Sequence, residues 1–216
     1  MSRIKRRTNL MADVITALTG GQDDLYDEII RENLSKRILI FNDEVNESVL
    51  ENYILHILKW NREDKEAGIP IDKRKCITIY INSPGGSSID GFSLVSAIQS
   101  STTKIRGVCF GLCASMGYHI FLACHERIAF RSSILLQHDG SLEISSSTQK
   151  AKQTMAFFDE MDKRTKEFVL SRTNMTEEFY DSVYDQEYWF YAYPKGKELG
   201  CVDKIIGEDC TLDDIL

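Results

Sequence analysis

Ser115 is the residue of this chain whose surroundings best suit a chemical role. It lies in the segment Gly-Leu-Cys-Ala-Ser-Met-Gly-Tyr, residues 111–118, directly after an apolar run. Small neighbours allow the backbone to turn sharply and a substrate carbonyl to approach, as a nucleophilic serine requires. The same residue could instead serve only as a helix cap, because serine is a common N-cap.

A nucleophilic serine needs a base, and the chain contains four histidines. His56 lies in an apolar helical stretch, and His125 lies in a polar turn. His119 follows Ser115 by one helical turn, so we expect it to point into packing. His138 ends an apolar strand, and catalytic groups gather at the carboxyl ends of parallel strands. We therefore expect His138 to be the base.

A second glycine-containing turn, Pro84-Gly85-Gly86, also follows an apolar strand. The N–H of Gly86 could approach a substrate with no Cβ in the way, and the N–H of Met116 would be a second donor to an oxyanion. The turn alone could equally be an ordinary one. Neither glycine-rich signature of a phosphate-binding loop is present.

Apolar runs of strand length alternate with helical patterns along most of the chain, which predicts an α/β fold with right-handed crossovers. Residues 61–75 are charged and contain Gly68 and Pro70, so we expect a loop there. The expected strands are 37–41, 76–81, 105–110, 127–130 and 134–136, and the expected helices are 46–59, one through 92–98, one beginning at 115, and 148–171.

The helix expected over residues 148–171 is the longest element. Met155, Phe158, Met161, Thr165 and Phe168 lie along one side of it at helical spacing. This side could pack in the core of the same subunit or against another subunit, and the pattern does not distinguish the two.

Composition limits the classes of function. The net charge of −7 does not favour nucleic-acid binding. The six cysteines lack metal-ligand spacing, so we expect mostly buried thiols in a reducing compartment, with no metal site. No apolar stretch is long enough for a membrane span, which favours a cytoplasmic location without membrane contact. We expect an N-terminal arm over residues 1–35, with a helical pattern at 11–18, and one domain over residues 36–216.

The chain resembles the proteolytic subunit of the Clp protease, the ClpP family. Three blocks are similar: residues 80–92 around Asn-Ser-Pro-Gly-Gly-Ser, residues 111–117, and Leu-Gly-Cys-Val-Asp at 199–203. The resemblance implies a crotonase-like β/α superhelix with a projecting long helix. It also implies stacked rings, typically two heptamers forming a tetradecamer, whose serine sites face a chamber fed by an AAA+ unfoldase.

The resemblance assigns roles to individual residues. Ser115 matches the nucleophile and His138 the base, while Gly86 and Met116 match the oxyanion donors. The third residue of the triad, the acid, depends on which residue of this late segment is aligned with the family. Trp189 as anchor places Glu187 there, with Asp185 two residues earlier as the alternative.

Two departures mark the chain as a divergent member. Pro194 and Gly200 as anchors would place Tyr188 at the acid position, and an insertion of one residue reconciles them with Glu187. In addition, Asp-Gly-Ser follows His138 where the family has Gln-Pro and a glycine-rich strand, so that residues 141–147 replace this strand.

The resulting prediction is a Clp-type serine endopeptidase that hydrolyses unfolded proteins or peptides through an acyl-enzyme. No cofactor is implied, and ATP would be used by the partner because this chain has no P-loop. The first alternative is a non-catalytic ring subunit, which the irregular acid region motivates. The second is a crotonase-like enzyme that handles acyl-CoA without a serine nucleophile.

Overall fold

The computed structural model describes residues 22–140 and 145–216. The chain divides into two compact units, residues 1–38 and 39–216. The first unit contains α2 (Gln22–Ser35), an exposed helix whose Arg31 forms a one-turn ion pair with Asp27. The helical pattern expected over residues 11–18 lies outside the described residues.

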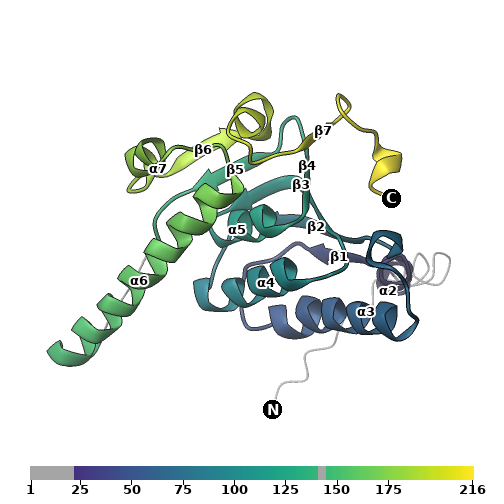
Figure 1. Ribbon diagram of the computed structural model, residues 1–216, viewed down its shortest axis with the longest axis horizontal. Helices are drawn as coiled ribbons and strands as arrows, with labels where there is room; N and C mark the ends of the chain where they lie inside the picture. Colours follow the sequence, from purple (N-terminus) through teal and green to yellow (C-terminus); the bar gives the residue numbers. More distant parts are fainter. Residues whose placement is uncertain (1–21, 141–144) are drawn as a thin grey trace, which may run out of the picture. The chain divides into compact units, whose positions relative to one another are not determined.

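A seven-stranded sheet organises the second unit as far as it is described (Figure 1). The strand order is β1-β2-β3-β4-β7, and β5 joins β3 on one side and β6 on the other. The pairs β2–β3, β3–β4, β3–β5 and β4–β7 are parallel, whereas β5–β6 is antiparallel. The strands are β1 (Ile38–Phe41), β2 (Ile77–Ser83), β3 (Ile105–Ala114), β4 (Glu126–Phe130), β5 (Ile134–Gln137), β6 (Tyr188–Tyr191) and β7 (Lys204–Ile206).

Strand β3 changes neighbours along its length. Its first part pairs with β4, from Arg106 to Cys109, and its last three residues pair with β5. The last of these pairs joins Ala114 to Leu136. The carboxyl ends of β3 and β5 therefore lie next to each other, and Ser115 and His138 follow directly after them.

Helices cover the sheet and complete the core. All eight residues of α5 are buried, which explains its continuous apolar sequence. Helix α4 packs against α5, and α6 runs from α5 away from the sheet (Figure 1). The helical elements of this unit are η1 (Leu50–Ile54), α3 (Leu55–Glu66), η2 (Ile71–Lys73), α4 (Ser88–Ser100), α5 (Met116–Ala123), α6 (Thr148–Arg172), α7 (Glu177–Val183), η3 (Ala192–Gly196) and η4 (Leu212–Asp214).

The predicted α/β class with a parallel sheet is confirmed, but the expected boundary between helix 46–59 and loop 61–75 is wrong. The helix runs to Glu66, because Trp60 and Asp64 lie one turn apart and are both buried. Asp64 is only 1% exposed, and its carboxylate accepts a hydrogen bond from Thr103 Oγ1 at 3.0 Å. A buried carboxylate with a hydrogen-bonding partner is compatible with a helix that composition alone marks as polar.

The cysteines are free thiols, and four of the six are buried, as expected: Cys109, Cys113, Cys124 and Cys201. Strand β3 extends four residues beyond its predicted end at 110, through the segment that leads to Ser115. In the part of the chain that the structure describes, no helix is both long and apolar enough to cross a membrane.

Candidate active site

Ser115 has a strained backbone at the junction of β3 and α5. Its φ of 52° and ψ of −123° place it in a region that non-glycine residues rarely adopt. Such a conformation costs about 1–3 kcal/mol and occurs mostly at functional sites. The side chain makes no capping hydrogen bond to α5. Capping therefore does not account for a serine at this position.

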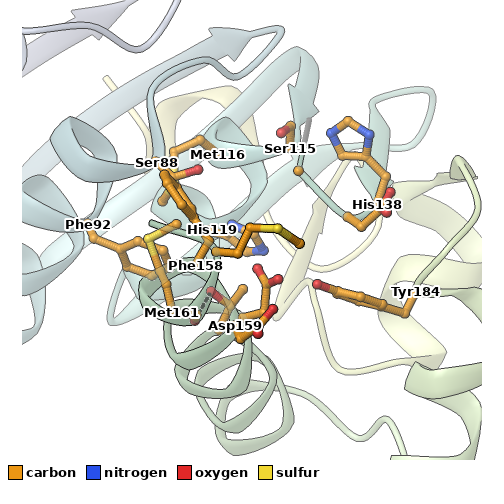
Figure 2. A pocket seen from close by; sticks show the side chains of 15 residues that line it. Ser88, Phe92, Ser115, Met116, His119, His138, Phe158, Asp159, Met161 and Tyr184 are labelled. Atoms are coloured by element: carbon orange, nitrogen blue, oxygen red, sulfur yellow. Dashed lines mark hydrogen bonds between the residues drawn. The ribbon is translucent and has the colours of Figure 1, made fainter. Parts of the chain in front are cut away.

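The sheet brings Ser115 and His138 to one cavity. The Ser115 N–H donates to the Leu136 carbonyl at 3.0 Å, which extends the β3–β5 pairing by one step. Both side chains line a cavity of about 160 Å³, which we call the serine cavity and which Met116, His119, Phe158 and Asp159 also line (Figure 2).

The imidazole of His138 has an unused nitrogen. Among the described residues, the buried Nε2 has no hydrogen-bonding partner, so no hydrogen bond joins it to the Ser115 hydroxyl. A buried polar atom without a partner is rare in folded proteins and calls for a functional explanation. Catalytic hydrogen bonds are often long in the absence of substrate, so this geometry is compatible with a serine–histidine pair.

The Pro84-Gly85-Gly86 turn packs directly on the Ser115 junction. A Cβ at Gly85 would come within 2.6 Å of Ser115 Cβ and 3.1 Å of Met116 N, so only glycine fits. Gly86 follows with φ +141° and forms a bridge to Val45. This bridge uses the Gly85 carbonyl and the Ser87 N–H, and not the Gly86 N–H.

Met116, the other expected donor, is the first residue of α5. The N–H groups of the first helical turn have no acceptor within the helix, and the helix dipole favours negative charge beside them. Met116 is buried and lines the serine cavity. The turn at Gly86 and the helix start at Met116 thus flank Ser115 from different elements of the chain.

His119 is buried, as expected, but it also lines the serine cavity, which the sequence did not indicate. Its ring stacks on Phe92 at a centroid distance of 6.0 Å, and its Nε2 lies 3.4 Å from Gln137 Oε1. Burial lowers the pKa of His119 to about 4, and the nearby His138 adds to this effect. The imidazole is therefore neutral near pH 7.

Glu187 directly precedes β6 and does not line the serine cavity. The β5–β6 pairing ends with Gln137 and Tyr188, and beyond this pair the Asp139 N–H donates to the Tyr184 carbonyl at 2.9 Å. The exposed Glu187 carboxylate accepts a hydrogen bond from Trp189 Nε1 at 3.1 Å. Asp185 is also exposed and lies outside the cavity.

Three further residues of the site escaped sequence reasoning. Asp159 and Asp162 of α6 and Tyr184, which follows α7, line the serine cavity. The aspartates come one residue after Phe158 and Met161, which also line the cavity. The signal in the sequence is the helical spacing of α6, which places these aspartates beside the apolar residues that line the cavity.

The described residues contain no group of three or more histidine, cysteine, aspartate or glutamate side chains arranged to hold a metal ion. The arrangement around Ser115 instead offers a hydroxyl, an imidazole, and backbone N–H groups. These are the parts of a site for acyl transfer.

Comparison with known proteins assigns the chain to a family. A family model described as Clp protease matches residues 21–209. Subunit 2 of the ATP-dependent Clp protease from Nocardia farcinica is 28% identical over 204 residues, which cover 92% of this chain and 94% of the relative. Subunit 1 from Bacillus cereus is 25% identical over 193 residues, which cover 88% and 93%.

A solved structure shows the same fold. A mutant of ClpP1 from Listeria monocytogenes superposes with a TM-score of 0.71 at 20% sequence identity, over 87% of this chain and 99% of the other. The family model spans most of the chain, and the relatives align over nearly their whole length at low identity. This chain is therefore a divergent member of the Clp protease family, with the α/β superhelical fold and long helix of ClpP.

Proposed function

We propose that this protein is a serine endopeptidase that hydrolyses peptide bonds through an acyl-enzyme formed on Ser115. The observation that carries this proposal is the shared cavity of Ser115 and His138. There a strained serine stands beside an imidazole whose buried Nε2 has no partner.

In the proposed reaction, Ser115 Oγ attacks the peptide carbonyl carbon while His138 takes the hydroxyl proton. The Gly86 and Met116 N–H groups stabilise the oxyanion of the tetrahedral intermediate. His138 returns the proton to the leaving amine, and the ester remains on Ser115. A water molecule, deprotonated by His138, then releases the new carboxylate.

Glu187 would orient the His138 imidazole from the neighbouring strand. Its position supports this role, because His138 directly follows and Glu187 directly precedes the last paired residues of β5 and β6, Gln137 and Tyr188. A carboxylate that accepts from one ring nitrogen fixes the tautomer in which the other nitrogen can act as base. For this role the Glu187 side chain must leave Trp189 and turn toward the ring.

The substrates would be unfolded proteins or peptides, and the working form a homo-oligomeric ring assembly, by analogy with the family. The names of the relatives describe proteolytic subunits of an ATP-dependent protease. A separate AAA+ unfoldase would then use the ATP and deliver the substrate. This division of labour is the reason to propose a chamber rather than an open active site.

A second candidate function is that of a non-catalytic ring subunit. It is favoured by one observation, namely that Glu187 is bonded to Trp189 and lies outside the serine cavity. Such a subunit would keep the fold and the assembly while lacking a working triad.

Hydrolysis of a fluorogenic peptide and of unfolded casein by the assembled protein distinguishes the two functions. Ser88 also lines the serine cavity, so Ser88→Ala is the matched control for Ser115→Ala. The peptidase predicts turnover that Ser115→Ala abolishes and Ser88→Ala retains. The same rate of hydrolysis in wild type and Ser115→Ala would contradict the peptidase function and favour the non-catalytic subunit.

A further inference from the structure

Two uncharged polar side chains lie buried beside the candidate nucleophile and base. His119 of α5 is 7% exposed, and Gln137, the last residue of β5, is 1% exposed. His119 follows Ser115 by one helical turn, and Gln137 directly precedes His138. A buried polar side chain is unfavourable unless it forms hydrogen bonds, so the partners of these two side chains show what they do.

The two side chains are hydrogen-bonded to each other and to the backbone of His138. The Gln137 Nε2 group donates to the His138 carbonyl at 3.2 Å, which identifies the nitrogen of the amide because a carbonyl oxygen only accepts. Gln137 Oε1 lies 3.4 Å from His119 Nε2 and can likewise only accept. The proton of the neutral imidazole is therefore on His119 Nε2, which donates to Gln137.

His119 is also bonded to the candidate nucleophile. Its backbone N–H donates to the Ser115 carbonyl at 3.2 Å. One residue of α5 is thus connected to Ser115 through its backbone, and to His138 through its side chain and Gln137. Burial is the main influence on the pKa of His119 and lowers it, the hydrogen bond to Gln137 raises it, and the charge of His138 lowers it. The two imidazoles are therefore close enough to interact.

The His119 ring is held in place by aromatic contacts. It stacks on Phe92 at a centroid distance of 6.0 Å and meets the edge of Phe168 at 6.3 Å. The helix that carries it is buried along its whole length. Close packing of this kind leaves a side chain few other rotamers, so the Nε2–H group of His119 is a donor with a fixed position.

His138, by contrast, lies where the regular sheet ends. The pairing of β5 with β6 stops at Gln137, and residues 139 and 140 are exposed. The peptide bond after His138 is held by two hydrogen bonds: its carbonyl accepts from the Gln137 side chain, and its N–H, that of Asp139, donates to the Tyr184 carbonyl at 2.9 Å. Of these two bonds, the one from Gln137 leads back to Ser115 through His119.

We propose that His119 and Gln137 are positioning residues, which link the His138 backbone to α5 and so hold the imidazole where it can take the proton of Ser115. This inference rests on the proposed peptidase function. Gln137 does not line the serine cavity, so it acts on the reaction only through His138. A displacement of about 1 Å between reacting groups can cost about 10²-fold in rate, so hydrogen bonds that fix a base have a large kinetic effect.

A purely structural role is the alternative. The neighbours of His119 are aromatic, and apolar residues at both positions would fill the same space without requiring hydrogen bonds. A structural role predicts that loss of the polar pair changes the stability of the fold but not the turnover at each folded site. The positioning role predicts a loss of turnover at each site.

Gln137→Met is the main variant, because it keeps the length of the side chain, removes both amide groups and changes a residue outside the cavity lining. Steady-state kinetics on a fluorogenic peptide are measured with the assembled full-length protein. The value of kcat is expressed per active site, and the sites are counted by fluorophosphonate titration. We expect kcat to fall by at least about tenfold while KM stays as in wild type.

Tyr118→Phe is the matched control. Tyr118 precedes His119 in the same buried helix, and the substitution removes the 3.2 Å hydrogen bond between its hydroxyl and Cys201 Sγ while the ring is kept. Because this bond is not part of the connection between Ser115 and His138, the variant should retain the wild-type kcat per active site.

His119→Phe tests the second link of the connection. It keeps an aromatic ring against Phe92 and removes the donor to Gln137. If His119 acts through Gln137, the double variant should lose no more kcat than Gln137→Met alone, whereas independent effects would multiply. Losses that multiply would overturn the connection between the two residues.

The outcomes separate this inference from the proposed function. A wild-type kcat in Gln137→Met, or a loss that Tyr118→Phe reproduces, would overturn the positioning role and leave the peptidase function intact. A raised KM with unchanged kcat in Gln137→Met would also overturn it. Absence of Ser115-dependent turnover in the wild type would overturn the proposed function, and this inference with it.

Discussion

The Ser115 N–H donates to the Leu136 carbonyl at 3.0 Å, and this bond joins the candidate nucleophile to the strand that carries the candidate base. His138 lies two residues beyond Leu136, so the end of β5 sets its position relative to Ser115. The bond forms although Ser115 has a positive φ, and the parallel pairing of Ala114 with Leu136 supports it. Regular hydrogen bonding between β3 and β5 thus keeps Ser115 in its strained backbone conformation.

Gly85→Ala should disrupt the Ser115 junction. The φ of +100° at Gly85 disfavours any side chain, and the Cβ of the alanine would lie 2.6 Å from Ser115 Cβ. We expect a loss of at least about 1 kcal/mol in the free energy of unfolding and of most peptidase activity. Gly140→Ala is the control, because no heavy atom lies within 4 Å of the Cβ that this substitution adds. Chemical denaturation of both variants checks this, and equal stability would contradict the close packing.

His138→Ala should reduce catalysis rather than substrate binding. Removal of the base leaves the nucleophile weakly reactive at neutral pH, and we expect kcat to fall by about 10³–10⁴-fold with little change in KM. Steady-state kinetics on a peptide substrate measure both constants. A large rise in KM with unchanged kcat would instead identify His138 as a binding residue.

Glu187→Gln should weaken the base by loosening its orientation. We expect kcat/KM to fall by about 10²–10⁴-fold, while Asp185→Asn stays close to wild type. Steady-state kinetics of both variants on a peptide substrate measure kcat and KM separately, and the loss is expected in kcat. The opposite ranking of the two variants would transfer the role to Asp185.

His119 makes stability depend on pH. Burial lowers its pKa from 6.5 to about 4, so between these values the unfolded chain binds more protons than the folded one. The contribution of the buried, neutral His119 to the free energy of unfolding is therefore fully present above pH 6.5 and is lost as the pH falls toward 4.

His119→Phe tests this dependence, because the ring already packs against Phe92 and Phe168. Between pH 8 and pH 5 wild type should lose about 2 kcal/mol more than the variant in the free energy of unfolding. Urea denaturation at the two pH values measures the difference. Parallel losses in both proteins would show that His119 is not held neutral.

Much of the fold is predictable from local sequence, because the signals there are strong. The run 77–81 and the wholly apolar α5 are continuous because both are buried. The glycine turn and Ser115 stand at strand ends, where a parallel sheet gathers functional residues. The ends of elements were less predictable: α3 continues to Glu66 because Thr103, distant in sequence, supplies a partner for buried Asp64.

The rest of the site depends on relationships that one segment does not contain. Asp159 and Asp162 are exposed on α6, and only the fold brings them to the cavity that Ser115, His138 and Tyr184 also line. The antiparallel pairing of β6 with β5 brings the chain next to Glu187 to the strand end that carries His138, and the aromatic segment 188–191 gave no clear sign of this strand. The replacement segment 141–147 lies partly outside the described residues.

The most direct test of the account is the position of a covalent adduct after reaction with a fluorophosphonate. Intact-mass spectrometry followed by peptide mapping identifies the modified residue. The account predicts one phosphonyl group per subunit, attached to Ser115, with no adduct in Ser115→Ala and a retained adduct in Ser88→Ala. An unmodified wild type in every assembled form, or an adduct of equal yield in Ser115→Ala, would contradict it.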